Sequence, residues 1–184
     1  MDIKVIKVNP QIDLSVRSLC IKSYHGHPKG CPNFNHKDGC PPESPTFEDV
    51  YDLSKPVYAI INKFNISEHR ERMHNLHPKW SLLQLDCCLY WQPKARKLLM
   101  VGIKQFLKEH SKYHVTTCPE AMGIEVTKTL EMVGINLEWP PVNFSYQVAL
   151  AGVESKCSSC GCTWFNGCWN GCHWVEKDKC SNCI

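Results

Sequence analysis

The end of the chain carries seven cysteines within residues 157–183. Cys157-x2-Cys160 and Cys180-x2-Cys183 form two short pairs separated by nineteen residues. Two such pairs can place four thiolates around one tetrahedral ion, which is the arrangement zinc favours in structural sites. The segment therefore predicts a zinc site.

Four further candidate ligands lie between these pairs, namely Cys162, Cys168, Cys172 and His173. Two separate four-coordinate ions need eight ligands, which the seven cysteines and His173 together supply. Two ions that share one bridging thiolate need only seven ligands and leave His173 free. The sequence favours zinc over an iron–sulfur cluster in this segment and leaves one or two ions open.

Three Cys-Pro pairs lie far upstream of the tail, beginning at Cys31, Cys40 and Cys118. A proline after a ligand cysteine rigidifies the chain as it leaves the metal, and Cys-Pro ends one common ferredoxin ligand run. Together with Cys20, these residues are the predicted ligands of an iron–sulfur cluster, with 4Fe-4S as the expected form. Cys118 precedes Pro119 at an expected helix start, where the helix dipole would lower the pKa of its thiol.

The upstream site has alternatives. His25, His27 and His36 lie in the same loop and offer a mixed Cys/His zinc site. A loop without metal is the third possibility. Cys87 and Cys88 lie on an expected helix, where neighbouring side chains point about 100° apart, so at most one of them could be a ligand. Both also fit as buried apolar residues.

The number of cysteines helps to indicate the cell compartment in which the protein works. Thirteen of 184 residues are cysteines, and the odd total disfavours a complete disulfide framework. The first fourteen residues lack the apolar core of a signal peptide, and no stretch approaches the roughly 20 apolar residues that span a bilayer. We therefore expect a cytoplasmic protein without a membrane segment, in whose reducing environment clustered cysteines bind metal.

The elements that must position these ligands follow from apolar periodicity and capping residues. Strands are expected at 3–8, 57–64, 114–118, 136–139 and 144–150, and residues 18–45 form a loop rich in proline and glycine. Thr46, Ser67 and Ser81 can cap helices that end near residues 49, 77 and 91. Two more helices are expected to begin at Pro93 and Pro119, the second ending at Gly134.

This order predicts an α/β or α+β fold in which a mixed sheet of about five strands is flanked by helices. We expect two units: a metal-binding body at 1–152, which includes the Cys/Pro-rich loop 18–45, and a small cysteine-rich, zinc-binding module at 153–184. No internal repeat is visible in the sequence.

Charge is concentrated in one part of the chain. Residues 69–112 contain nine Lys and Arg against three acidic residues, an excess of +6, whereas the whole chain carries only +3. This basic block is either a solvated helix face or a surface for nucleotide or nucleic acid. The sequence contains no Walker loop and no GxGxxG, HExxH, GxSxG or deaminase HxE…PCxxC pattern. No motif therefore indicates a hydrolase or a nucleotide-dependent enzyme.

Aromatic residues stand among the tail cysteines, at Trp164, Phe165, Trp169 and Trp174. They either form the small core of a module folded by its metal or present a docking face for a partner protein or stacked bases. The tail itself is not basic, because Glu176 and Asp178 balance Lys177 and Lys179.

Two segments resemble known groups of proteins. The order Cys20 … GCPNFN … GCPPESPTFEDV … TCPEAMGIEVTKTLEMVGI, over about residues 18–140, resembles a cysteine-rich family of predicted metal-binding proteins of unknown function. That family also has a ferredoxin-like CxxCxxC cluster, which is absent here. The tail resembles a module of the form CxxCGCT…C…GCxWVE…CSxC that is appended to bacteriophage and prophage proteins. The resemblances imply a phage-type metalloprotein of the host cytoplasm.

Three functions are compatible with these features. The first is redox or sulfur-handling chemistry at an iron–sulfur cluster in the body, acting on a nucleotide or nucleic acid, with structural zinc in the tail. The second is a non-catalytic zinc-binding adaptor that docks protein or nucleic acid. The third is a protein whose metals only hold the fold. The sequence does not decide whether the chain is an enzyme.

Overall fold

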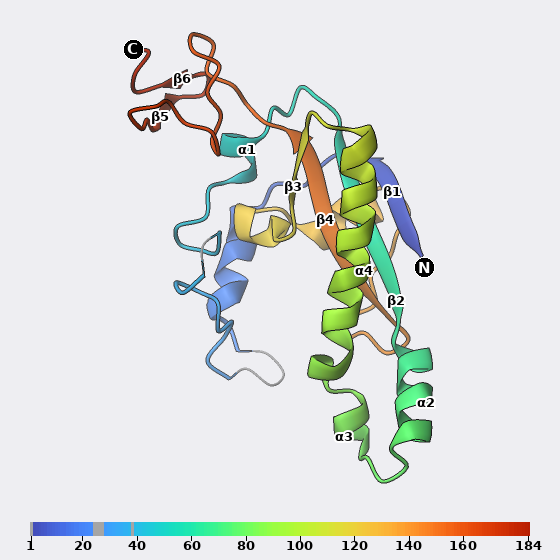
Figure 1. The fold of residues 1–184 in the computed structure, drawn as a ribbon. Coiled ribbons are helices and arrows are strands. Elements are labelled where there is room, and N and C mark those ends of the chain that lie inside the picture. Colours follow the sequence, from blue (N-terminus) through green and yellow to red (C-terminus); the bar gives the residue numbers. More distant parts are fainter. Residues whose placement is uncertain (1, 24–27, 38) are drawn as a thin grey trace.

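The computed structural model describes residues 2–23, 28–37 and 39–184. Four strands form the main sheet in the order β1-β2-β4-β3, and all neighbouring pairs are antiparallel (Figure 1). These strands are β1 (Ile3–Val8), β2 (Val57–Asn65), β3 (Tyr113–Thr116) and β4 (Phe144–Val153). The tail adds a two-stranded sheet of β5 (Trp174–Glu176) and β6 (Lys179–Cys180). The predicted α/β class with a C-terminal cysteine cluster is confirmed, with four strands in the body's sheet.

Seven helical segments accompany the sheets in the described part of the chain. The α-helices are α1 (Phe47–Val50), α2 (Ile66–Leu76), α3 (Leu82–Leu85), α4 (Cys88–Glu109) and α5 (Val126–Glu131). Two 3-10 helices, η1 (Leu14–Ile21) and η2 (Pro119–Met122), lie in the connections. Among the described residues, no helix combines the length and apolar character that crossing a membrane requires.

The two central strands are buried on both faces. In β2 the sequence VYAIINKF is a nearly continuous apolar run, which is typical of a strand covered on both sides. Its register against β4 pairs Ala59 with Leu150 and Ile60 with Ala149, so adjacent pairs point to opposite faces of the sheet. The sheet is therefore the middle layer of three.

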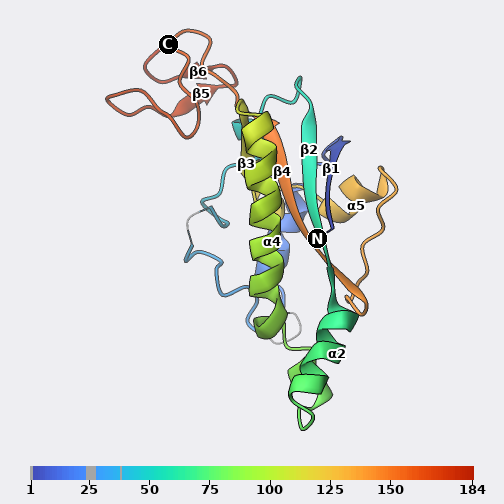
Figure 2. The ribbon, with the colours of Figure 1, turned by 45° about the vertical axis from the view of Figure 1, so that its right-hand side comes forward.

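Helix α4 covers one face of the sheet (Figure 2). Its buried residues recur every three or four positions, and Leu99, Ile103 and Phe106 pack against Ile60 and Ala149. The 22 residues of the helix span about 33 Å, enough to run the whole length of the strands.

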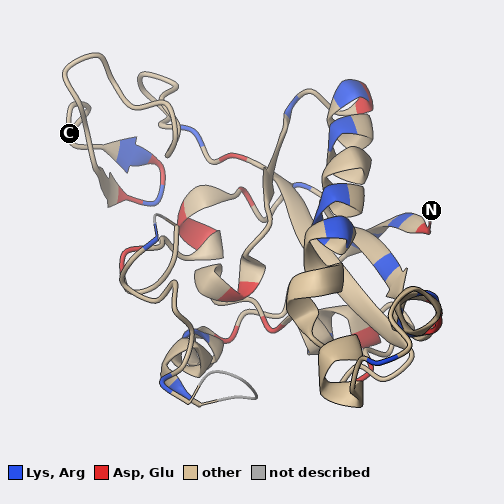
Figure 3. Cartoon of the chain, turned by 60° about the horizontal axis from the view of Figure 1, so that its bottom comes forward, with Lys and Arg blue, Asp and Glu red and all other residues tan. Residues whose placement is uncertain are grey.

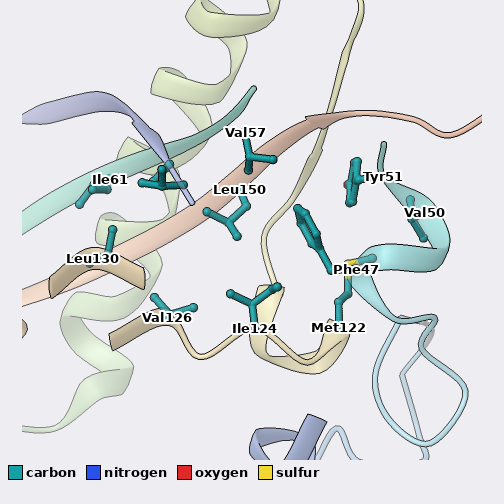
Figure 4. Close-up of a cluster of buried hydrophobic side chains, with 12 residues drawn as sticks. Phe47, Val50, Tyr51, Val57, Ile61, Met122, Ile124, Val126, Leu130 and Leu150 are labelled. Carbon is teal, nitrogen blue, oxygen red and sulfur yellow. The ribbon is translucent and has the colours of Figure 1, made fainter. Parts of the chain in front are cut away.

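Short segments cover the other face instead of a long helix. Phe47 and Tyr51 meet Ile124 and Leu130 below the sheet, and all four side chains are at most 1% exposed (Figure 4). Segments α1, η2 and α5 supply most of this layer. Because these segments are short, turns and loops hold much of the second face.

The chain path has a split β-α-β arrangement. Strands β2 and β3 are joined through α4 and run in the same direction, and β4 is inserted between them antiparallel to both. The tail begins where β4 ends. Ser155 N donates to Val50 O at 2.9 Å, and Asp52 N donates to Val153 O at 2.9 Å, so α1 holds the start of the tail.

Several predicted boundaries are confirmed. Thr46 caps α1 and Ser81 caps α3, each in a capping box with Asp49 or Gln84 at the third helical position. The strands predicted at 3–8, 57–64, 114–118 and 144–150 correspond to the four strands of the main sheet.

The helix predicted from Ser81 to residue 91 is wrong at its end. Helix α3 stops at Leu85, and a new helix begins at Cys88, so Pro93 lies inside α4 rather than in its first turn. Pro93 cannot donate a hydrogen bond to Leu89 O. The helix tolerates this loss because Pro93 and Leu89 lie on its exposed side, where water can reach the carbonyl.

Two further predictions need correction. Residues 136–139 form no strand, because both neighbours of β4 are already in place and Glu138 instead accepts hydrogen bonds from Asn143 N and Phe144 N, both at 2.9 Å. The helix predicted from Pro119 to Gly134 is divided into η2 and α5. Gly123 separates them with a φ of 86°, a left-handed conformation that ends the first segment.

We expect Gly152→Ala to destabilise the protein by about 1–3 kcal/mol, because an added methyl group overpacks the core. That methyl carbon would lie 2.7 Å from Tyr51 Cδ1, and the Tyr51 ring is 1% exposed. Urea denaturation measures the change. Gly102→Ala is the matched control, since the three atoms nearest its methyl group all belong to the half-buried Ile3 side chain and alanine favours the helix by about 1 kcal/mol. An equal or smaller loss at Gly152 than at Gly102 would contradict this packing.

Candidate metal centres

The backbone of the tail turns tightly at each cysteine pair. Gly161 N donates to Cys157 O at 2.8 Å, and Cys183 N donates to Cys180 O at 2.9 Å. Gly161 has a φ of 73°, a left-handed conformation that glycine adopts without a steric penalty. These turns bring the two sulfurs of each pair to the same side of the chain.

The sulfurs of the tail converge into two overlapping groups. In the first, the ligand atoms of Cys157, Cys160, Cys180 and Cys183 all lie within 4.8 Å of one another. In the second, Cys160 and Cys180 are joined by Cys162 and Cys168 under the same limit. Either group could hold a metal ion. The two groups share an edge, because Cys160 and Cys180 belong to both.

The sulfur–sulfur distances match the geometry of one tetrahedral ion. Cys160, Cys168 and Cys180 form a triangle whose sides are 3.6, 3.7 and 3.8 Å. Four sulfurs at about 2.3 Å from a central zinc ion are about 3.8 Å apart. The triangle therefore has the dimensions of one face of a metal–thiolate tetrahedron, and the Cys162 sulfur, within 4.8 Å of all three, is the candidate fourth ligand.

Backbone amides stabilise some of the thiolates. The N–H groups of Cys160 and Cys180 bond to the Cys157 sulfur and lower the pKa of Cys157 to about 6. The Cys172 sulfur accepts from Cys168 N at 3.2 Å, which lowers the pKa of Cys172. In contrast, hydrogen bonding with the Cys160 and Cys172 sulfurs raises the pKa of Cys168 to about 12. The sulfurs cannot all be ionised together unless a cation lies among them.

The two remaining candidate ligands occupy different positions. Cys172 Sγ lies 3.8 Å from Cys162 Sγ, beside the second group. His173 is exposed, its N–H donates to Ser181 Oγ at 3.2 Å, and it belongs to neither group of ligand atoms. All seven cysteines of the tail thus meet in one cluster, which His173 does not join.

The upstream cysteines are positioned by contacts between the loop and η2. Ser44 is buried and its hydroxyl donates to Ala121 O at 2.7 Å, which ties the end of the loop to the segment after Cys118. Arg17 donates to Ser44 O at 2.8 Å and to Pro42 O at 3.0 Å. These contacts fold the loop that carries Cys40 back onto η1.

A second contact fixes Cys31 beside Cys20, the penultimate residue of η1. Cys31 N donates to Cys20 O at 2.7 Å. Gly30 precedes it with a φ of 84°, and a Cβ there would lie 2.6 Å from Cys20 O. Only glycine allows this close approach of the two cysteine backbones.

The four predicted upstream ligands are half-buried neighbours that lie farther apart than the tail cysteines. Burial and then the nearby Cys31 and Cys40 raise the pKa of Cys20, with a smaller contribution from Cys118. Burial and then Cys118 raise the pKa of Cys40. In the described part of the chain, no three of these sulfurs lie within 4.8 Å of one another. A single ion would need them closer, whereas a multi-iron cluster spreads its ligands around its own body.

The other upstream candidates lie apart from this group. His25 and His27 fall outside the described residues. His36 lines an open pocket of about 560 Å³ together with Cys20 and Cys31. Cys87 is the N-cap of α4 and Cys88 its first residue, which is exposed. The expected helix after Cys118 is the four-residue 3-10 helix η2, whose dipole is much smaller than that of a full α-helix.

The basic block is mostly exposed on α2 and α4. Lys97, Lys104 and Lys108 are exposed and lie opposite the buried residues Leu99, Ile103 and Phe106 of α4. Figure 3 shows the Lys and Arg positions along this helix. Arg70 instead pairs with Asp86, with its Nε donating to Oδ1 at 2.7 Å. The outer face of α4 is therefore a solvated cationic stripe.

The tail aromatics divide between packing and exposure. Trp174 packs against the cysteine cluster, whereas Trp169 is 101% exposed. The Phe165 ring lies 4.3 Å from the His114 ring of β3, and His114 Nδ1 bonds to Tyr51 Oη at 2.8 Å. This link between tail and body gave no signal in the sequence, because its three residues are widely separated and follow no motif.

Comparison of the chain with protein-family models, with curated proteins and with solved structures finds no match.

Proposed function

We propose that the chain is a zinc- and iron–sulfur-binding metalloprotein whose tail holds two zinc ions in one thiolate cluster. The observation that carries the zinc proposal is the triangle of Cys160, Cys168 and Cys180, whose sides of 3.6–3.8 Å equal the edge of a zinc–thiolate tetrahedron. The CxxC spacing of the two cysteine pairs supports zinc as the ion.

Six sulfurs are enough for both ions. Cys160 and Cys180 bridge the two ions as the shared edge. Cys157 and Cys183 complete the first ion, and Cys162 and Cys168 complete the second. Cys172 stands beside the second ion at 3.8 Å from Cys162 and accepts the Cys168 amide.

The zinc has a structural role in this proposal. The buried cluster of the tail consists of Cys157, Cys162 and Cys180, with Trp174 and further cysteines packed against it. A segment with so little apolar surface cannot offset the entropy of ordering its backbone. Metal binding then supplies the folding free energy of the tail, as in other small zinc modules.

Zinc content per chain, measured by elemental mass spectrometry, tests the shared edge. The unaltered protein is expected to hold about two zinc ions. Cys160→Ser and Cys180→Ser should each lower the content below about one ion, since each removes a ligand from both ions. Cys183→Ser should retain the second ion.

His173→Gln is the control and should leave zinc content unchanged. Loss of one ion in His173→Gln would favour two separate four-ligand sites and contradict the bridged arrangement. A content of one zinc ion per chain in the unaltered protein would contradict the proposal of two ions.

We further propose that Cys20, Cys31, Cys40 and Cys118 hold an iron–sulfur cluster of the 4Fe-4S type, used for redox or sulfur-handling chemistry. The support is their common position around one loop, their half-buried sulfurs and their wider separation than in the tail. Half-buried ligands leave a cluster open to a small substrate or an electron partner.

Protein prepared without oxygen is expected to be brown and to carry about four irons per chain. Cys118→Ser should abolish most of this iron and the visible absorption while zinc content remains unchanged. Cys88→Ser, at an exposed cysteine outside the group, is the matched control and should keep the iron. Colourless anaerobic protein that holds zinc alone would rule out the cluster.

A second candidate function is docking of a partner protein by the tail. It is favoured by Trp169, whose indole is 101% exposed although it stands next to the metal cluster. Exposed tryptophans are frequent anchors of protein interfaces.

Trp169→Ala should then abolish co-purification of a partner that the unaltered chain captures, with zinc content unchanged. Trp139→Ala is the control, because Trp139 is 71% exposed on the body. Equal loss of the partner in both variants, or retention in both, would argue against docking by the tail.

A further inference from the structure

A pocket of about 500 Å³ lies at the end of the sheet opposite the tail. It opens between the last residues of β2, the start of α2 and the first half of α4, with Asp2 and Phe144 at its rim. Its wall contains two buried polar side chains, Asn62 and His69, which are 1% and 4% exposed. Neither metal centre involves this pocket.

The hydrogen bonds of His69 fix which ring nitrogen carries the proton. Arg72 Nη2 lies 3.2 Å from His69 Nδ1, and a guanidinium can only donate, so Nδ1 is the acceptor. Burial, followed by the charges of Arg72, Lys94 and Arg70, lowers the pKa of His69 and keeps its ring neutral at pH 7. The proton is therefore on Nε2, which is buried and has no hydrogen-bond partner.

Asn62 presents the complementary group. Its Nδ2 donates to Ala95 O at 2.9 Å, and a carbonyl can only accept, so the orientation of the amide is fixed. Asn62 Oδ1 is buried and also lacks a partner. The wall thus contains one unpaired donor and one unpaired acceptor, both of which carry a desolvation penalty until a ligand pairs with them.

Cations surround these two groups. Lys63, Arg72 and Lys94 line the pocket, and Asp2 and Glu68 are the acidic residues that line it with them. Lys63 Nζ lies 3.9 Å from the centre of the Phe144 ring, on the face of the sheet opposite Asn62, so Arg72 and Lys94 are the cations on the Asn62 side. The lining carries an excess of positive charge, so an anion is attracted to it.

We propose that this pocket binds a phosphate group that keeps a P–OH, either as inorganic phosphate or on a small phosphomonoester bound as its monoanion. Its oxygens accept from His69 Nε2 and from Arg72 and Lys94, and its hydroxyl donates to Asn62 Oδ1. The two buried atoms are closed to solvent in the structure. The anion therefore reaches them only when side chains of the lining move.

Titration calorimetry with the full-length, metal-loaded protein at pH 7 tests this assignment, with inorganic phosphate as the probe and sulfate as the matched anion. Phosphate is expected to bind with a dissociation constant of about 1 mM or tighter. Sulfate has no hydroxyl at this pH and would leave Asn62 Oδ1 unpaired, so it should bind at least about tenfold more weakly. Equal binding of the two anions, or no binding of either, would overturn the proposal.

Adenosine monophosphate distinguishes the source of the group when it is compared with inorganic phosphate at pH 6, where about half of the monoester keeps a P–OH. Tighter binding than that of inorganic phosphate identifies a nucleotide, for which a pocket of this volume has room. Weaker binding identifies the free anion.

Variants of the wall locate the site. Arg72→Gln and Lys94→Gln should each weaken phosphate binding at least about fivefold, because each removes a charged donor. Lys97→Gln is the control, since Lys97 is exposed on the same helix and does not line the pocket. Loss of affinity in all three variants alike would mean that the anion is attracted only by the general charge of α4.

His69→Leu separates a binding role from a structural one. It should abolish phosphate binding without lowering the unfolding midpoint in urea, because it removes an unpaired buried N–H. A lower midpoint with binding retained would show that His69 only supports the fold and would overturn its assigned role.

Discussion

Antiparallel pairing of β2 with β4 is the interaction on which the rest of the molecule depends. Eight residue pairs hold the two strands together, from Tyr58 with Ala151 to Asn65 with Phe144. Both faces of this pair are buried, one by α4 and the other by short segments around Phe47 and Ile124. The pairing also fixes the functional geometry, because the tail leaves one end of β4 and the polar pocket lies at the other end of β2.

The tail follows a different physical rule from the body. The body buries apolar side chains on two faces of a sheet, whereas the centre of the tail is a cluster of sulfurs. Adjacent thiols suppress one another's ionisation, which is why the pKa of Cys168 is raised while backbone amides lower that of Cys157. A divalent cation reverses this opposition, since it stabilises every thiolate around it. A bound metal would therefore couple side-chain packing and backbone order in the tail.

Three sites of different chemistry are separated along the molecule. The tail cluster lies beyond β4, the upstream cysteines gather where the loop meets η2, and the pocket opens between α2 and α4. The contact of Phe165 with His114 and the bond of His114 to Tyr51 connect the tail to the second core layer. The tail is thus packed against the body through aromatic rings, whereas the pocket lies at the far end of the sheet.

Local chemistry in the sequence determined much of the fold and indicated which tail cysteines are candidate ligands. The apolar run of β2, the capping boxes at Thr46 and Ser81, and the paired cysteines each act within a few residues, so their spacing can be interpreted directly. Tertiary structure alone decided that residues 136–139 stay outside the sheet, that Cys160 and Cys180 are shared by two groups, and that His173 belongs to neither group. It also decided that Asn62 and His69 meet in one pocket. These features depend on which distant segments occupy neighbouring space, and no periodicity within a single segment encodes that.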